Sequence, residues 1–167
     1  MSQHSGYLRS ERRRGLPIVF VDRPPTGLAA DSVVSANFEG ALQAVRHLAA
    51  HGHRRIAFVG DVPATLYTRR ERWRGYRQAL DEAGIRYSPE LVEQGHHETD
   101  EAAAAYRLLR IADPPTAIFA GNNLACMGVV MALTRARRHD VAIVGFDDFV
   151  FADVLHPGIT VVAQDVE

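Results

Sequence analysis

The feature of this sequence that most constrains its fold is a short apolar run that ends in polar residues and occurs four times. The clearest copy is VAIVGFDDF (141–149), where nearly unbroken apolar residues, mostly β-branched, precede a glycine and two carboxylates. The other copies are PIVFVDRP (17–24), RIAFVGD (55–61) and AIFAGNN (117–123). A run without polar alternation is typical of a strand buried on both faces, as in a parallel sheet.

The segments between these runs have the apolar periodicity of amphipathic helices. One helix is expected after Asn37 as its N-cap, and Gly52 is expected to end it. A second is expected at 69–83, with a capping box formed by Thr68 and Glu71. The remaining helices are expected from Thr99 to the prolines at 114–115, and at about 124–137 with Asn122 or Asn123 as the cap.

Short extended segments complete the pattern, at 31–35, 91–94 and 159–164. The resulting element order is β-β-α-β-α-β-α-β-α-β-β. Strands that alternate with helices indicate an α/β fold, a doubly wound parallel sheet with helices on both faces.

Polar residues stand where the expected strands end, and they predict a binding site at one edge of the sheet. In open α/β sheets, ligands bind in the crevice beyond the carboxyl ends of the strands. The residues that this rule places at the edge are Asp22, Arg23, Asp61, Asn122, Asn123, Asp147 and Asp148.

Arg72 is one of five arginines at the start of the helix expected at 69–83. The cluster could be a phosphate or nucleic-acid patch, but a solvated helix face is the simpler interpretation for the other members. Arg72 lies in the first turn of a helix that follows a strand, so its guanidinium can reach the edge of the sheet. A guanidinium donates paired, directional hydrogen bonds to hydroxyl or carboxylate oxygens.

Two other groups of polar residues are weaker candidates for a metal or catalytic site. The histidines at 47, 51, 53, 96 and 97 could bind zinc, but no HExxH motif and no cysteine lies at ligand spacing, so a structural or surface role is expected. Asp147 and Asp148 could hold Mg²⁺ or act as acid and base. Because neighbouring strand residues point to opposite faces, we expect a hydrogen-bond acceptor for a ligand hydroxyl instead.

Composition excludes several classes of protein. The net charge of −1 gives no basic field of the kind that nucleic-acid binding needs. The single cysteine, Cys126, rules out an internal disulfide and fits a reducing cytoplasm. No apolar run approaches the ~18 residues of a membrane span, and the first residues lack a secretory signal. Without phosphate-binding or nucleophile-elbow motifs, we expect a cytoplasmic, non-enzymatic protein with no cofactor, no metal site and no membrane contact.

In order and spacing, several motifs resemble the effector-binding core of the LacI/GalR family of bacterial transcription regulators. The motifs are LPIVFVDR (16–23), HLAAHGHRRIAFVGD (47–61), RRERWRGYRQAL (69–80), PPTAIFAGNNLACMG (114–128), VAIVGFDD (141–148) and ITVVAQD (159–165). The resemblance implies doubly wound parallel sheets of the periplasmic-binding-protein-like type I kind. It also implies a small-molecule effector, sugar-like, bound in a cleft between two lobes, and a homodimer.

The positions that match the family's ligand contacts are Asp22, Thr68, Arg72, His97, Asn122, Asp147 and Gln164. The chain departs from the family pattern at Asn123, where Asp is usual, at Cys126, where Ala is usual, and at His97, where an aromatic ring is common.

The family's helix-turn-helix and hinge helix have no counterpart in these residues, so DNA contact is expected only through a headpiece outside this chain. We expect a polar tail or helix remnant at 1–15, a partial and incomplete N-lobe at 16–51, a C-lobe at 52–149 and a return crossover to the N-lobe at 150–167. The alternatives are a solute-binding protein for transport and, less in keeping with the residues, an enzyme that uses Asp147 or Asp148.

Overall fold

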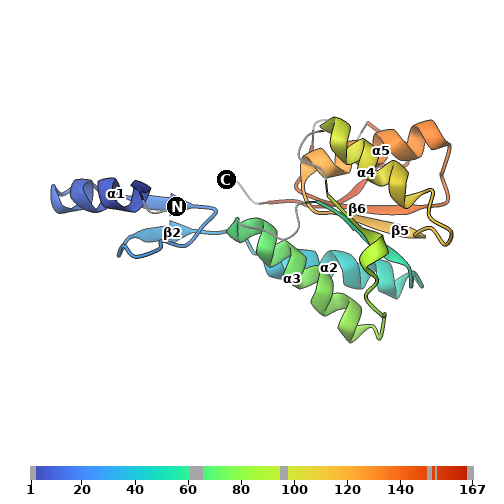
Figure 1. Ribbon diagram of the computed structural model, residues 1–167, viewed down its shortest axis with the longest axis horizontal. Helices are drawn as coiled ribbons and strands as arrows, with labels where there is room; N and C mark the ends of the chain where they lie inside the picture. The colour runs from blue at the N-terminus through green and yellow to red at the C-terminus, as the bar shows by residue number, and fades with distance from the viewer. Residues whose placement is uncertain (1–2, 61–65, 95–97, 150–151, 153, 165–167) are drawn as a thin grey trace.

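The computed structural model describes residues 3–60, 66–94, 98–149, 152 and 154–164. A smaller unit at the N-terminal end holds the helix α1 (Gln3–Arg13) and the strands β1 (Val19–Val21) and β2 (Asp31–Val33). A larger unit forms the other end of the molecule (Figure 1). None of the helices that the structure describes is long and apolar enough to cross a membrane.

The larger unit is built on a parallel sheet with strand order β4-β3-β5-β6-β7. Its strands are β3 (Ile56–Val59), β4 (Val92–Glu93), β5 (Ala117–Ala120), β6 (Ala142–Phe146) and β7 (Thr160–Val162). The helices are α2 (Asn37–Ala50), α3 (Tyr67–Glu82), α4 (Glu98–Leu108) and α5 (Asn123–Ala136), with a short 3-10 turn η1 at Pro89–Leu91. The pair α2 and α3 covers one face of the sheet, and α4 and α5 cover the other (Figure 1). The predicted α/β class is therefore confirmed.

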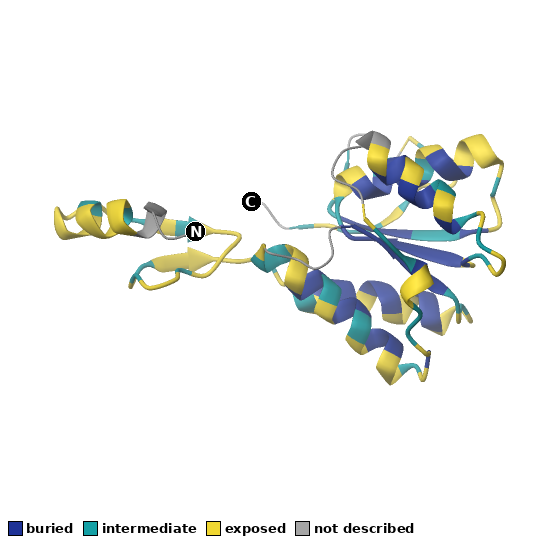
Figure 2. Ribbon diagram, viewed as in Figure 1, coloured by how far each residue is buried: buried dark blue, intermediate teal, exposed yellow. Residues whose placement is uncertain are grey.

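Alternating strand residues supply the two hydrophobic layers. Phe58 and Phe119 face α2 and α3, where Tyr76 and Leu80 complete the packing. Val59 and Ile118, from the same strands, belong to the opposite layer under α4 and α5. Because β3 and β5 are buried on both faces, their sequences show no polar alternation. The buried residues lie on the sheet and on the helix faces that cover it (Figure 2).

The smaller unit buries little of its apolar surface. Strands β1 and β2 pair in parallel, with Val19 opposite Asp31 and Val21 opposite Val33. Val19 is 57% exposed, and Val21 and Val33 are each 65% exposed. A parallel sheet normally has both faces covered, so this pair of strands lacks the cover that the larger sheet has.

The helix α2 packs with the larger unit. Ala41, Val45 and Leu48 belong to the same buried cluster as Phe58 and Tyr76. The predicted boundary near residue 51 would cut through this cluster. We now propose that the division falls between β2 and α2.

The helix ends correct two of the predicted caps. Asn37 is the first residue of α2 and does not cap it, since the N-cap position is Ala36. Thr68 lies inside α3, whose N-cap position is Leu66, so the expected capping box is absent. Asn122 does cap α5, because its side-chain oxygen accepts a hydrogen bond of 2.8 Å from the Ala125 N–H.

Candidate functional site

Arg72 is the central residue of the candidate site, which lies where the predicted edge of the sheet meets α2 and α3. Its side chain is buried, and Nη1 donates to Asp147 Oδ2 and to the Gly121 carbonyl oxygen, each at 2.9 Å. Nε donates to Asn37 Oδ1 at 2.8 Å. The guanidinium carbon stacks 3.8 Å above the centre of the Phe146 ring. Ends of three elements therefore converge on one cation, as the strand-end rule predicts.

Asp147 connects this cation to the end of β7. Its two carboxylate oxygens face the two terminal nitrogens of Arg72, at 2.9 and 3.4 Å, and Oδ1 also accepts from Gln164 Nε2. The Asp147 backbone has φ +69°, in the left-handed region that few residues other than glycine adopt. Its N–H still donates to the Val162 carbonyl at 3.0 Å, so the turn is tied to β7.

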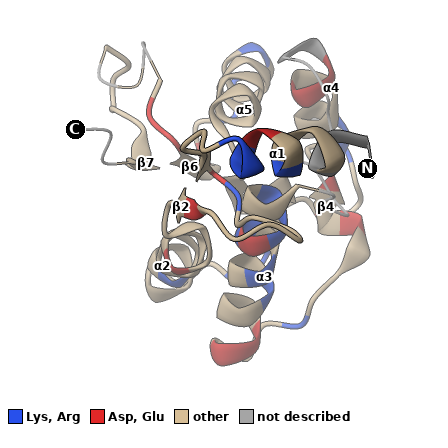
Figure 3. Ribbon diagram, turned by 90° about the vertical axis from the view of Figure 1, so that its left-hand side faces the viewer, with Lys and Arg blue, Asp and Glu red and all other residues tan. Residues whose placement is uncertain are grey.

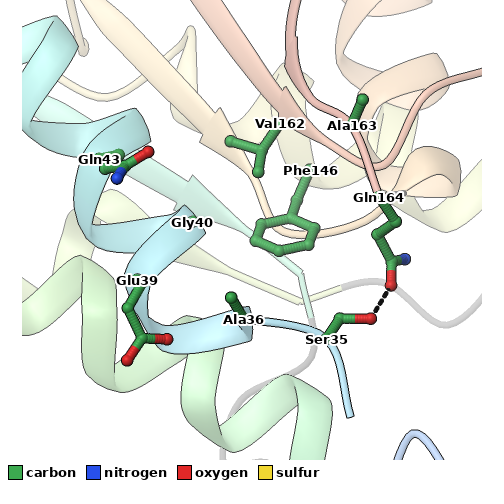
Figure 4. A pocket seen from close by; sticks show the side chains of 9 residues that line it. All are labelled: Ser35, Ala36, Glu39, Gly40, Gln43, Phe146, Val162, Ala163 and Gln164. Carbon is green, nitrogen blue, oxygen red and sulfur yellow. Dashed lines mark hydrogen bonds between the residues drawn. The ribbon is translucent and has the colours of Figure 1, made fainter. Parts of the chain in front are cut away.

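Ser35 and Asn37 complete a closed ring of hydrogen bonds. Ser35 Oγ donates to Gln164 Oε1, as Figure 4 shows, and Asn37 Nδ2 donates to the Ser35 carbonyl at 3.0 Å. With the bonds above, the ring runs Ser35–Gln164–Asp147–Arg72–Asn37 and returns to Ser35. Sequence patterns did not indicate Ser35 or Asn37 as site residues. Asn37 was interpreted as a helix cap, and nothing local marks Ser35.

The charges of the site compensate each other. Burial lowers the pKa of Arg72 below its ordinary value, and the charge and hydrogen bonds of Asp147 oppose that shift, with a smaller contribution from the charge of Asp22. An arginine with a nearby carboxylate keeps its proton at neutral pH. The site therefore contains a fixed cation and a carboxylate whose outer side is partly exposed.

Asp22 and Thr68 line a cavity of about 470 Å³ between the smaller unit and the start of α3. Arg23 and Tyr67 also line it. Asp22 is exposed and stands in the left-handed region, with φ +60°. The charge of Asp22 also contributes to the shift of the Arg72 pKa, which links this predicted residue of the smaller unit to the site in the larger one.

A second cavity of about 330 Å³ adjoins the ring from the side of β7 and α2 (Figure 4). Phe146 and Val162 provide its apolar wall, and Ser35, Glu39 and Gln164 provide polar groups. Gln164 thus belongs both to the ring and to the wall of this cavity.

The remaining residues predicted at the edge have separate environments. Asn122 is partly buried, and its oxygen is used by the cap of α5, so its amide N–H groups are what it can offer to a ligand. Asp148 is exposed and accepts from the Phe149 N–H at 2.8 Å, away from the Arg72 pair. Asn123 is also exposed. Asp61 and His97 lie outside the described residues.

Several of the described arginines and histidines outside the ring make local contacts on their own helices. Arg70 and Arg74 pair with Glu71, and acidic positions accompany the basic ones on α1 and α3 (Figure 3). His51 Nδ1 lies 2.8 Å from the His47 carbonyl oxygen. Among the residues that the structure describes, no three His, Cys, Asp or Glu side chains gather as they would around a metal ion.

The chain is an α/β protein of the doubly wound class, and its polar side chains converge at the carboxyl ends of parallel strands, where proteins of this class bind their ligands. A family of periplasmic binding protein-like domains matches residues 45–167. The chain therefore belongs to the family of periplasmic binding protein-like domains, in the form found in LacI-type transcription regulators.

Two relatives illustrate the match in sequence. The chain is 38% identical to the HTH-type transcriptional regulator CelR of Thermobifida fusca over 160 residues, which are 92% of this chain and 46% of that protein. It is 36% identical over 140 residues to the "Probable opine utilization operon repressor" of Rhizobium rhizogenes, with 78% of this chain and 71% of that protein covered. The chain spans about half the length of CelR.

Solved structures of LacI-type regulators have the same fold. A regulatory protein of the LacI family from Chloroflexus aggregans matches with a TM-score of 0.83 and 27% identity, over 94% of this chain and 58% of that one. A LacI family regulator from Enterococcus faecium with bound ribose has a TM-score of 0.81 and 25% identity, over 93% and 59% of the two chains. The CelR–cellobiose complex has a TM-score of 0.79 and 35% identity, over 90% and 47%.

Proposed function

We propose that this chain is the effector-sensing part of a LacI/GalR-type transcription regulator and binds a sugar or a similar small polar molecule. The observation that carries the proposal is the pair formed by buried Arg72 and partly exposed Asp147 at the carboxyl ends of the strands, to which Asp22 of the smaller unit adds a nearby negative charge. A fixed cation and a carboxylate side by side can accept and donate hydrogen bonds to neighbouring hydroxyl groups. The ribose and cellobiose bound to similar regulators support this ligand class.

In the proposed site, each unit contributes polar groups to the ligand. Asp22 and Thr68 line the cavity between the units, while Arg72, Asp147 and Gln164 present charged and amide groups from the larger unit. Asn122 donates N–H groups, because its oxygen is used by α5. We also assign His97 to this site on the strength of the family match alone.

The relatives support a proposal for the biological setting. We place the regulator in the cytoplasm, as a non-enzymatic sensor whose DNA contacts come from a headpiece outside this chain. A second copy of the chain is the proposed partner. The exposed Leu124 and Met131, which lie seven residues apart and so on one side of α5, offer apolar surface for that contact.

Sugar binding is tested by a thermal-shift screen of monosaccharides and disaccharides, with ribose and cellobiose included. At about 100 times Kd, binding adds roughly 2.7 kcal/mol to the unfolding free energy, which raises Tm by about 5–10 °C for a domain of this size. The screen uses both this chain and the complete regulator, since the smaller unit here is only two strands wide.

The site assignment is tested by titrating the sugar that the screen finds. Loss of a charge-assisted hydrogen bond costs roughly 1.5–3 kcal/mol, so Arg72→Ala should weaken binding by about 10- to 150-fold. Arg72→Lys should recover only part of the loss, because an ammonium lacks the planar fork. Asp22→Asn changes an exposed residue and should weaken binding without loss of folding.

The matched control for these variants is Arg86→Ala, which removes an exposed arginine from the cavity formed by residues 54–55 and 84–89. It should bind the sugar as the unmodified chain does. Unchanged affinity in Arg72→Ala or in Asp22→Asn would show that the residue in question does not contact the ligand.

A further inference from the structure

The ring Ser35–Gln164–Asp147–Arg72–Asn37 contains Ser35, from the short segment that joins the units, and Asn37, which directly follows that segment. Val33 ends β2 in the smaller unit and Asn37 begins α2 in the larger one. We propose that the ring couples occupancy of the site to this joining segment, residues 34–36, with Gln164 as the member that moves. The proposal rests on the proposed function, because it concerns regulation of the same site.

The hydrogen-bonding capacity of Asp147 explains why a ligand would disturb the ring. Oδ1 already accepts from Arg72 Nη2 and from Gln164 Nε2, so both of its lone pairs are used. Oδ2 accepts from Arg72 Nη1 and has one lone pair left. A ligand with two adjacent hydroxyl groups, donating one hydrogen bond to each oxygen, must therefore displace a donor from Oδ1.

Gln164 is the donor that such a ligand displaces. Arg72 is held by Asn37, Gly121, Asp147 and the Phe146 ring, and it is buried. Gln164 is only half-buried, and it lies on the wall of a cavity of about 330 Å³. Fewer contacts hold Gln164, so it yields before Arg72 does.

Movement of Gln164 affects the joining segment because its side-chain amide bonds to both Asp147 and Ser35. The oxygen of that amide accepts from Ser35 Oγ while its nitrogen donates to Asp147, so both bonds change together. The Ser35 carbonyl accepts from the Asn37 N–H at 2.7 Å and from Asn37 Nδ2 at 3.0 Å. Release of Ser35 therefore loosens the segment at its junction with α2.

Through this ring, a ligand would change the relative free energies of two arrangements of the units. With the ring closed, segment 34–36 is bound to the end of β7. With Asp147 bound to ligand hydroxyls, the segment loses that contact and keeps only its bonds to the first turn of α2, from the Asn37 and Gly40 amides. A ligand shifts a conformational equilibrium only through such a difference between two states.

Amide hydrogen exchange in the absence of any sugar tests the coupling. The Asn37 and Gly40 amides, which donate to the Ser35 and Ala36 carbonyls, report on the junction. Gln164→Ala should raise their exchange rates by about tenfold, the loss expected for one hydrogen bond. Asp147→Ala should do the same, although Asp147 reaches the segment only through Gln164 or through Arg72 and Asn37.

The matched control is Asp148→Ala, which removes the neighbouring carboxylate outside the ring. Its junction amides should exchange at the unmodified rate. The Val144 amide in the buried strand β6 monitors global stability in every variant. Ser35→Ala removes the Ser35–Gln164 hydrogen bond with a smaller change of side chain. It replaces Gln164→Ala in the experiment if that variant does not fold.

A double variant separates the ring from independent contacts. If the ring is one unit, Ser35→Ala with Gln164→Ala should exchange no faster at Asn37 than either single variant. The proposal would be overturned if the two substitutions multiplied each other's effect on the Asn37 exchange rate. It would also be overturned if that rate did not change, or if the Val144 amide were accelerated equally. Since no sugar is used, failure here is distinct from failure of the sugar titration.

Discussion

At the scale of single residues, Arg72 shows how a ligand-binding group can also be structural. Its cation lies inside the protein because Asp147, Asn37 and the Gly121 carbonyl satisfy its donors and the Phe146 ring covers its face. A buried charge without such partners would be strongly destabilising. Its position early in a helix that follows a strand indicated that Arg72 reaches the edge of the sheet. Its structural partners depend on α2, which packs beside α3.

Cys126 is a second residue whose chemistry depends on its surroundings. Burial raises the pKa of its thiol from 9.0 to about 12. Since the thiolate is the reactive form, iodoacetamide at pH 8.5 should label the native chain at least about 100-fold more slowly than the chain unfolded in urea. Equal rates in the two states would contradict this burial.

The same shift makes stability depend on pH. Between pH 9.0 and about 12, the folded chain keeps a proton that the unfolded chain loses, so the free energy of unfolding falls as pH rises through this window. Burial raises the pKa of Tyr76 as well, which acts in the same direction. Urea unfolding at increasing alkaline pH measures the fall, and Cys126→Ser, with no thiol, should show a smaller one.

At the scale of elements, the contact between α2 and α3 depends on a glycine. A Cβ added at Gly75 would overlap the Phe38 carbonyl oxygen and lie 2.8 Å from Ala41 Cβ. Gly75→Ala should therefore lower the free energy of unfolding by about 1–3 kcal/mol, because the helices must separate. Urea denaturation measures this change.

Gly6 in α1 is the matched control for that substitution. A Cβ there meets nothing within 4 Å, so Gly6→Ala should leave stability unchanged or raise it by up to about 1 kcal/mol through helix propensity. Equal losses in the two variants would mean that the close approach of α2 and α3 is not what Gly75 provides.

The helix caps show the limit of prediction from local patterns. Asn122 caps α5 as expected, because its side chain bonds to the helix that follows it directly. Asn37 has the same side chain at a helix start, yet it bonds to Ser35 behind it and to Arg72 on another helix. A cap competes with tertiary partners, and the sequence does not show which partners are near.

At the scale of the whole molecule, the two units should differ in stability. The sheet of the larger unit is covered on both faces, while β1 and β2 form a pair with exposed valines. Amides of Val19–Val21 should therefore exchange at least about 100-fold faster than the Val144 amide. Hydrogen exchange measures both in one sample, with sedimentation run at the same concentration. Equal protection in a monomer would show that the pair is stable by itself.

The sequence by itself determined the order of the elements from β1 onward, the parallel α/β class and the polar edge of the sheet. These features are local in origin: apolar runs of four or five residues, helical periodicity and polar residues at strand ends. Asp147 and Asn122 were predicted at this edge because strand ends in a parallel sheet must meet there, and Arg72 because it lies early in a helix that follows a strand.

Only the tertiary structure decided which of these residues touch. The placement of α2 beside α3, and so the position of the boundary between the units, depends on which apolar faces pack together. The ring through Ser35 and Asn37 joins positions that are up to 129 residues apart in the chain. Its bonds depend on the folding of separate segments onto one core, and no local pattern encodes a contact between side chains so distant in sequence.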